Sequence, residues 1–292
     1  MGSWMSSNRL VTNTARPSHR LLAGCLVLVA AVACGGPARA TDATLKATYF
    51  IALAGFPIGR ASVDSWLTDT EYATIIEGST FGLTRLVSDS RAVLIGNGSI
   101  DGTEILPATY SYLTSEGGSE SRVTMALSDH AVVELDADPE LSDSPDRIPL
   151  TEDHRRRIVD PVSAFIVSLA DSTHPDGETV CRRTVPVFDG WQRFDVKLDY
   201  KRTETVDGRG DSYSGPVIVC GARYVPVAGH RMSREAIEYM AKNERLEVWM
   251  APVANTTLMV PHRIVIGTKI GDLTVYAREF VVTASERQAR VD

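Results

Sequence analysis

Among the residues that could perform acid–base chemistry, His230 has the most distinctive context. It follows Ala228-Gly229, and glycine allows the backbone to bend sharply where a strand ends. A histidine exposed at such a rim could act as a base or donate a hydrogen bond at the edge of a pocket. The same sequence also suits an exposed turn histidine beside Arg231 that binds nothing. His230 is therefore our candidate for ligand binding, and the sequence assigns no catalytic residue.

The other histidines after residue 40 do not form a metal-binding motif. His130, His154, His174 and His262 stand apart from one another, and the sequence contains no H-E-x-x-H motif. A preformed zinc site normally has histidines or cysteines a few residues apart. His262 follows Pro261 at the predicted edge of a strand and is typical of a residue that flanks the core. We expect no bound metal and no cofactor.

Other motifs favour structural interpretations. The segment Gly78–Gly82 lacks the G-x-S-x-G spacing of a nucleophile elbow and predicts a turn at the end of a strand. Asp189-Gly190, which precedes a long strand, also predicts a turn. The run Arg155–Arg157 resembles a small anion site, but in an acidic protein it favours a solvated loop that pairs with Glu152 and Asp153.

Cys181 and Cys220 are the only cysteines after residue 40. In an exported chain an even number of cysteines predicts a structural disulfide. Closing the loop between them stabilises the fold by at most about 4 kcal/mol in the chain-entropy model. A redox pair or a metal site is the alternative interpretation. Neither cysteine has a C-x-x-C partner or a nearby histidine, which favours the structural bridge.

The N-terminal segment predicts export from the cytosol. Several arginines and no acidic residue accompany the apolar run Leu21–Ala33, which has 13 residues. That length fits the apolar region of a signal peptide, about 7–15 residues, and is short of the roughly 20 that a membrane-spanning helix needs. Ala38-Arg39-Ala40 has the small-x-small pattern of a cleavage site. We therefore expect residues 1–40 to be a cleavable signal peptide and the protein to be periplasmic.

Lipid attachment is the minor alternative to soluble export. Ala31-Val32-Ala33-Cys34 follows the order of a lipoprotein box, but alanine replaces the leucine that such boxes usually carry. Cleavage after Ala40 would instead remove four arginines and change the formal net charge from −7 to −11. Nucleic acids and anionic lipid surfaces call for basic patches, so we expect no nucleic-acid partner. We also expect no integral membrane span.

Alternating apolar and polar residues predict β-strands through most of the chain. The clearest example follows Gly190, where Phe194, Val196, Leu198 and Tyr200 alternate with charged residues. Such runs recur as about ten strands without a regular βαβ alternation, which indicates an antiparallel meander. The other predicted strands are 45–53, 58–67, 72–79, 91–100, 108–114, 122–127, 216–227, 245–250, 257–266 and 273–282.

Two helices are expected to interrupt the strands. Asp160-Pro161 offers an N-cap and a proline at the first helical position, and Val162–Leu169 then has one apolar stripe. His174–Gly177 ends this predicted helix, and a shorter helix covers 233–242. The polar residues 136–153 predict a surface loop. The composition, 43% hydrophobic and 23% charged, is ordinary for a globular protein and excludes a wholly disordered chain.

These elements predict a mainly β fold with few helices. A strongly curved antiparallel sheet, or open barrel, around the Val162–Leu169 helix would bury the most apolar surface. We assign residues 1–40 to the signal peptide, 41–286 to one exported β-rich domain, and 287–292 to a short tail.

Several short motifs resemble an exported bacterial family of unknown function, DUF3108. They are Tyr49–Gly59, Asp160–Phe165, Val187–Gly190, Cys220, Pro226–His230, Val248–Pro252 and Val260-Pro261. The resemblance extends over nearly all of the chain after residue 40. It implies export and a curved sheet similar to lipoprotein-carrier folds, in which an open barrel surrounds a helix. It implies no reaction and no catalytic residues.

Two classes of function follow. The first is a non-enzymatic envelope protein that binds a lipid, a lipoprotein or an extended peptide in a groove at the barrel mouth. The alternative is a hydrolase or isomerase that acts on envelope polymers, with a site built from His230 and carboxylates of distant loops.

Overall fold

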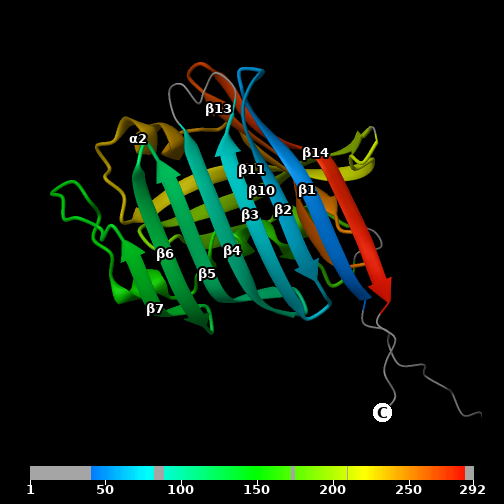
Figure 1. Cartoon of the computed structure of the whole chain (residues 1–292), viewed down its shortest axis with the longest axis horizontal. Helices are drawn as coiled ribbons and strands as arrows, with labels where there is room; N and C mark the ends of the chain where they lie inside the picture. The colour runs from blue at the N-terminus through cyan, green and yellow to red at the C-terminus, as the bar shows by residue number, and fades with distance from the viewer. Residues whose placement is uncertain (1–40, 82–88, 172–174, 209, 287–292) are drawn as a thin grey trace, which may run out of the picture. The chain divides into compact units, whose positions relative to one another are not determined.

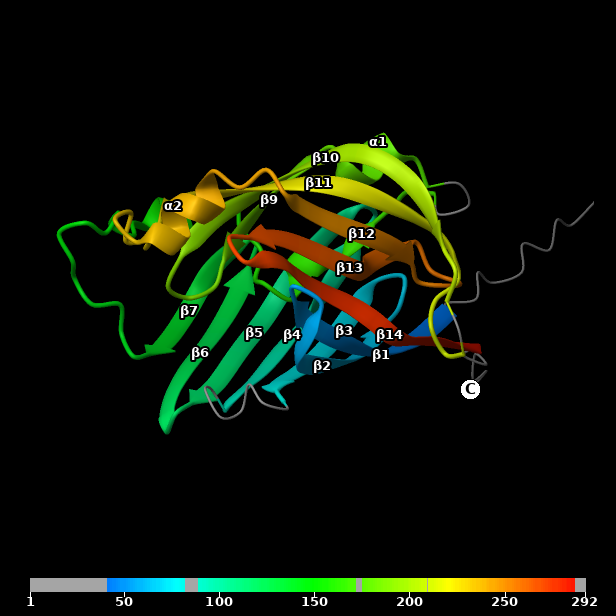
Figure 2. The ribbon, with the colours of Figure 1, turned by 90° about the horizontal axis from the view of Figure 1, so that it is seen from above.

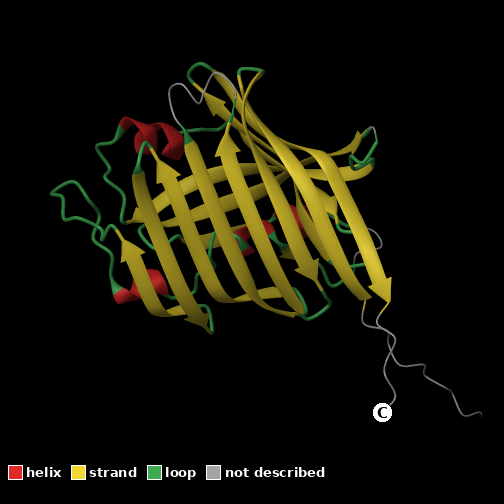
Figure 3. Ribbon diagram, in the orientation of Figure 1, coloured by secondary structure: helices red, strands yellow, loops and turns green. Residues whose placement is uncertain are grey.

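Fourteen β-strands form one sheet in the part of the chain that the computed structural model describes, residues 41–81, 89–171, 175–208 and 210–286 (Figures 1 and 3). The strands are β1 (Thr41–Leu53), β2 (Phe56–Leu67), β3 (Glu71–Thr80), β4 (Ser90–Asp101), β5 (Glu104–Glu116), β6 (Ser119–Ser128), β7 (Ala131–Asp138), β8 (Val167–Ser168), β9 (Arg183–Phe188), β10 (Arg193–Val206), β11 (Gly215–Ala228), β12 (Leu246–Pro252), β13 (Leu258–Thr268) and β14 (Gly271–Glu286). The helices α1 (Gly177–Cys181) and α2 (Glu235–Ala241) are short. The predicted mainly β fold with few helices is confirmed.

Two antiparallel meanders meet in the middle of this sheet. The strand order is β7-β6-β5-β4-β3-β2-β1-β14-β13-β12-β11-β10-β9, and β8 pairs with β13 outside this path. The first and last strands are therefore neighbours, and they pair over most of their length. Leu45, Ala47 and Tyr49 of β1 are buried, as the alternation in the sequence predicts.

The sheet curls so that its two edge strands, β7 and β9, lie near each other. Figures 1 and 2 show β2–β6 as one wall and β9–β12 as the opposite wall. A connecting segment hydrogen-bonds to both edges: Arg156 forms an antiparallel bridge with Ala131 of β7, and Val159 forms a parallel bridge with Val187 of β9. The two walls thus enclose an interior, which the segment between β7 and β9 occupies.

The segment inside the curled sheet is not the predicted helix. Residues Ser163–Phe165 form a single 3-10 turn, and Val167–Ser168 form β8, which pairs with β13. The prediction of a helix over Val162–Leu169 is wrong, and so is the prediction that the sheet surrounds a helix.

The core explains why this segment is extended. Its apolar residues belong to three different hydrophobic clusters: Val162 packs beside β5 and β6, Ile166 beside β1 and β14, and Leu169 beside the disulfide. A helix would place these side chains on one stripe and could serve only one wall. An irregular segment can direct one side chain to each cluster, so it packs inside the sheet in place of the predicted helix.

The sequence also misplaced one helix boundary and missed some strands. Helix α1 begins at Gly177, where the prediction ends a helix, because the Asp176 side chain accepts a hydrogen bond from the Thr179 amide at 3.0 Å. Strands β7, β8 and β9 were not predicted. The second helix is confirmed within its predicted range. The predicted signal peptide, Cys34 and residues 287–292 lie outside the described residues.

Candidate functional site

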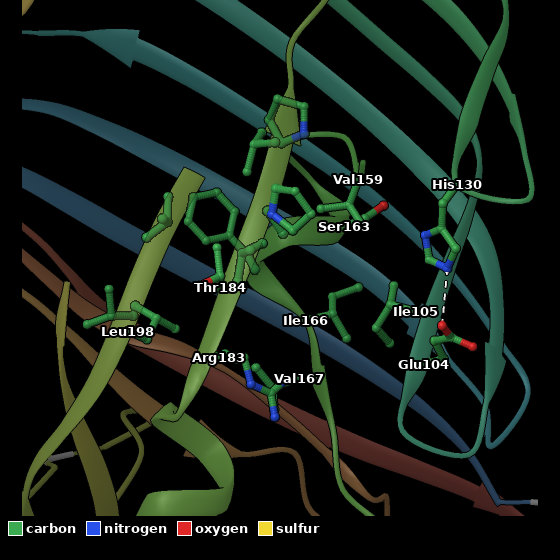
Figure 4. A pocket seen from close by; sticks show the side chains of 18 of the residues that line it. Glu104, Ile105, His130, Val159, Ser163, Ile166, Val167, Arg183, Thr184 and Leu198 are labelled. Atoms are coloured by element: carbon green, nitrogen blue, oxygen red, sulfur yellow. Dashed lines mark ion pairs between the residues drawn. The ribbon is translucent and has the colours of Figure 1, made fainter. Parts of the chain in front are cut away.

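A cavity of about 580 Å³, partly open to solvent, lies within the curled sheet and is the candidate site (Figure 4). Its lining comes from the inner segment between residues 157 and 167, from β9 and β10, and from the start of β5. Most of the lining is apolar: Ile105, Val159, Pro161, Ala164, Phe165, Ile166, Val167, Val185, Pro186, Val187, Phe194, Val196, Leu198, Val248, Met250 and Pro261. An interior space of this volume lies in the range of about 300–1,000 Å³ that small-molecule pockets occupy.

The alternation in β10 supplies one wall of this cavity. Phe194, Val196 and Leu198 line it, as their position on the apolar face of the predicted strand indicates. They lie opposite Val187, Val185 and Arg183 of β9 in the antiparallel register. The apolar face that the sequence predicts is therefore directed at the cavity.

Phe165 is a large apolar side chain that the rest of the described chain covers only in part. It is 41% exposed although it lies on the inner segment. It lines both the main cavity and a second one of about 230 Å³, which β1, β2 and β3 help to form. Ile166 and Pro261 also line both spaces. The interior thus presents apolar surface on both sides of the Phe165 turn.

A polar turn holds the inner segment in place. Asp160 is fully buried, and its Oδ1 accepts hydrogen bonds from the amides of Val162 (2.8 Å) and Ser163 (3.1 Å). The Ser163 hydroxyl donates to the other carboxyl oxygen and lies 2.5 Å from the Tyr72 hydroxyl. Burial raises the pKa of Asp160, and the hydrogen bonds from Ser163 and Val162 oppose that shift. The predicted capping role of Asp160 is therefore real, although it caps a turn instead of a helix.

Arg183 is the cationic residue on the inward side of β9. Its Nη2 donates a hydrogen bond to the Thr179 carbonyl at 3.1 Å. Within the described residues no carboxylate forms an ion pair with Arg183, and its buried Nε has no hydrogen-bond partner. Burial lowers the pKa of the Arg183 guanidinium. Figure 4 shows its side chain beside Val167 and Ile166 in the cavity.

A second polar group lines the cavity at the β5 end. His130 Nε2 lies 3.5 Å from a carboxyl oxygen of Glu104, and the carboxylate is largely exposed. Asp129 and Arg157 line the same side. In the view of Figure 4, Ile105 and Ile166 lie between this group and Arg183. The cavity therefore has a half-buried cation in one place and a solvated mixture of charges in another.

The predicted disulfide is present. Cys181 and Cys220 are bonded, with their Cα atoms 5.4 Å apart, and both residues are fully buried. The bond joins the end of α1 to β11. Because Arg183 follows Cys181 by two residues, the disulfide also fixes the start of the strand that carries Arg183.

His230 does not lie at an exposed rim. Its ring is 1% exposed, Nε2 lies 3.1 Å from the Arg193 carbonyl, and the Tyr224 hydroxyl lies 3.2 Å from Nδ1. Burial lowers the pKa of His230. Gly229 has the positive φ of +80° that the predicted sharp bend needs. The bend thus directs His230 inward, where its ring contacts the Phe194 ring of the cavity lining, although His230 itself does not line the cavity.

These contacts give His230 a structural role. The ring joins β10 to the end of β11, since its partners are a carbonyl of one strand and a hydroxyl of the other. Within the described chain the side-chain partner of the ring is the Tyr224 hydroxyl, and neither ring nitrogen bonds to a carboxylate.

The remaining predicted residues are also placed. His262 is buried between the rings of Tyr213 and Phe280, in agreement with a core-flanking position. Asp189 accepts hydrogen bonds from the two amides that follow Gly190, which confirms the turn. Arg155 pairs with Glu152 at 3.3 Å, as the solvated-loop interpretation predicts.

In the described ranges, no group of three or more His, Cys, Asp or Glu residues could hold a metal ion. His154 bonds to Thr151, and His174 lies outside the described residues. Among the helices that the structure describes, none combines the length and apolar character needed to cross a membrane.

The comparison with protein families agrees with the motifs in the sequence. The model described as "Protein of unknown function (DUF3108)" matches residues 46–278. The chain belongs to the DUF3108 family. No curated protein matches this DUF3108 chain. The crystal structure of a beta-barrel-like protein of the domain of unknown function DUF1849, from Brucella abortus, is similar to it with 10% identity and a TM-score of 0.45; the match covers 82% of this chain and 98% of that one.

The residues of this DUF3108 cavity that the sequence interpretation missed are Arg183 and Phe165. A signal for Arg183 exists: it shares the period-two face of Val185 and Val187, so a cation interrupts an otherwise apolar face. Phe165 was assigned to the buried stripe of a helix, and only the irregular backbone leaves it uncovered. The cavity itself depends on the curvature of the sheet, which no local pattern encodes.

Proposed function

We propose that this protein is a non-enzymatic component of the periplasm that binds a small apolar ligand in its interior cavity. The observation that carries this proposal is the cavity of about 580 Å³, lined largely by apolar side chains of the inner segment, β9 and β10. The space is partly open to solvent, so water contacts this apolar lining. A ligand that covers the lining would bind by the hydrophobic effect.

The exposure of Phe165 supports the same function. Large apolar side chains on an interior segment are normally covered, and this one is 41% exposed between two cavities. Covering apolar surface contributes about 25 cal/mol for each Å² removed from water. An apolar chain beside Phe165 would therefore bind by the hydrophobic effect.

The edge of β9 favours a lipid-like ligand over an extended peptide. Val159 already pairs with this edge through the Pro186 carbonyl and the Phe188 amide. Pro186 has no N–H, so it cannot donate to an added strand. Few backbone groups next to the cavity remain for β-augmentation, which needs a row of them.

Export is part of the proposal and rests on the N-terminal pattern. The apolar run Leu21–Ala33 and the Ala38–Ala40 cleavage pattern motivate it, and a disulfide suits an oxidising compartment. We expect the wild-type chain in the periplasmic fraction of its host and a Leu28→Arg variant in the cytosol. Recovery of the wild-type chain from the cytosol alone would contradict export.

Binding is tested by recovery of a ligand from the purified protein. We expect native mass spectrometry of the full chain after export to show a bound species, and solvent extraction to release a lipid. Val196→Trp, which places a large side chain in the cavity, should abolish recovery of that species.

Val133→Trp is the matched control. Val133 is a strand valine of β7 that is 61% exposed and does not line the cavity. The control variant should retain the ligand at the wild-type level. An empty wild-type protein that also binds no added lipid, or equal recovery from the Val196 variant and the wild type, would refute the proposed function.

A further inference from the structure

We propose that Arg183 binds the carboxylate of a long-chain fatty acid whose hydrocarbon chain occupies the main cavity. This inference rests on the proposed binding function and deepens it, because it assigns the chemical class of the ligand and the residue that selects it. The observation that carries it is a half-buried guanidinium on the lining of an apolar cavity without an anionic partner in the described chain.

Burying a charge costs free energy. An arginine remains protonated in a protein, so a guanidinium that is withdrawn from water needs an anion or enough acceptors to offset desolvation. Arg183 has the Thr179 carbonyl at 3.1 Å, while its Nε is buried without a partner. A carboxylate would supply two acceptor oxygens in the geometry that matches the planar guanidinium.

The neighbouring arginine shows the contrast. Arg182 precedes Arg183, points away from the cavity lining, and pairs with Glu178 at 3.1 Å. Its side chain is 83% exposed. The chain thus satisfies the surface arginine with its own carboxylate and leaves the cavity arginine for another one.

Charge complementarity also sets the orientation of the ligand. At the β5 side of the cavity the lining mixes the acidic residues Glu104 and Asp129 with the cationic Arg157, and the Glu104 carboxylate is largely exposed, so the charges there oppose one another and are screened by water. Near Arg183 the lining includes the apolar residues Leu198, its partner in the β10 register, and Val167, which lies next to it in the view of Figure 4. The carboxylate therefore lies at Arg183, and the hydrocarbon chain extends along the inner segment toward Phe165.

The size of the cavity favours one hydrocarbon chain. Its volume of about 580 Å³ lies within the small-molecule range. A diacyl phospholipid would have to place a second chain and a large polar headgroup in the same space. A single-chain carboxylate meets both the size and the charge of the site.

The test compares palmitate with hexadecanol, a neutral alcohol with a chain of the same length, by isothermal titration of the full chain. We expect wild-type protein to bind palmitate about tenfold or more tightly than hexadecanol, since a hydrogen bond to a charged group is worth more than a neutral one. Arg183→Met keeps an apolar stem and removes the charge. It should lose that preference while binding hexadecanol as well as the wild type.

Arg182→Met is the matched control and should keep the wild-type preference for palmitate. Retained hexadecanol binding shows that the Arg183 variant is folded with an intact cavity. If both ligands bind the wild type equally, or Arg183→Met keeps the preference, the Arg183 assignment is refuted and the proposed function stands. If neither ligand nor a diacyl lipid binds the wild type, the proposed function fails with it. Binding of diacyl lipid vesicles in preference to palmitate also overturns the assignment.

Discussion

Asp160 and Arg183 are both ionisable groups inside the curled sheet, and they differ in how the fold satisfies them. Asp160 is fully buried and accepts hydrogen bonds from two amides and a serine hydroxyl. Arg183 donates one hydrogen bond to a carbonyl and, within the described ranges, has no carboxylate in salt-bridge distance. The first group belongs to a closed network of the chain itself. The second has no such network in the described chain, and we propose that a ligand carboxylate completes it.

Polar groups that stabilise the fold can therefore be distinguished from polar groups that are available to bind a ligand. A buried polar group whose partners all come from the chain rigidifies the structure, and removing it leaves those partners unsatisfied. A half-buried charge without a partner carries an uncompensated desolvation cost, so replacing it with an apolar side chain is neutral or slightly stabilising for the fold and has a large effect on binding. The two residues therefore predict opposite results when each is replaced.

The largest effect on stability is expected at Asp160. Asp160→Ala removes the acceptor for the Val162 and Ser163 amides and for the Ser163 hydroxyl. We expect a loss of about 3–5 kcal/mol in the free energy of unfolding, because several buried donors lose their partner. Urea denaturation followed by tryptophan fluorescence measures it.

Asp160→Asn is the control for this prediction. The asparagine retains an oxygen in the capping position and should lose less than half as much stability as alanine. Arg183→Met should change the free energy of unfolding by less than about 1 kcal/mol. If Asp160→Ala proves no more harmful than Arg183→Met, the distinction between the two sites is wrong.

The next effect concerns the wall that carries Arg183. The Cys181–Cys220 bond closes a loop of 39 residues and holds the end of α1 against β11. Replacing both cysteines by alanine should cost about 2–4 kcal/mol in unfolding free energy. The preference for palmitate over hexadecanol should persist, because the disulfide supports the site without contacting a ligand.

Reduction of the wild-type protein is the complementary experiment. A reducing agent should lower the urea midpoint of the wild type and leave that of the double alanine variant unchanged. Titration of free thiols in the exported protein should give none from these two residues. Reactive thiols, or a midpoint that reduction does not move, would show that the bond contributes nothing.

The sheet could be predicted from the sequence because its signals are local. In β10 the alternation of Phe194, Val196 and Leu198 with charged residues depends only on neighbours in the chain, and the structure places those apolar side chains on the cavity wall. The disulfide could also be predicted, because the chain has two cysteines after residue 40 and the N-terminal pattern predicts export. The interior segment was different, since Val162, Ile166 and Leu169 have helical spacing but serve three clusters.

The candidate site could not be predicted for the same reason. A cavity is the space that remains after distant segments pack, and it depends on where Phe165 fails to meet the opposite wall. His230 shows the same limit in another form: the bend at Gly229 was predictable, but the direction in which the ring points was not. Tertiary contacts with Tyr224 and Arg193 decided that direction.

The smallest predicted effect extends the comparison to the buried histidines. His230 has hydrogen-bond partners for its ring, whereas neither ring nitrogen of His262 has one in the described part of the chain. Burial lowers the pKa of both residues below the ordinary value of 6.5. A lowered pKa means that the unfolded chain binds the proton more readily than the native one, so stability is complete above pH 6.5 and falls as the pH drops toward the native pKa.

His262→Phe should sharpen this contrast. A phenyl ring suits the space between Tyr213 and Phe280 and removes both the unpaired nitrogens and the titration. Between pH 7 and pH 5 we expect the free energy of unfolding to fall by about 1 kcal/mol more in the wild type than in the variant. Melting temperatures measured at the two pH values report this difference. His154→Phe, in the solvated loop, should follow the wild type. A His262 variant with the same acid sensitivity as the wild type would show that its burial does not control the response, and the pH dependence would then come from His230 and the surface charges.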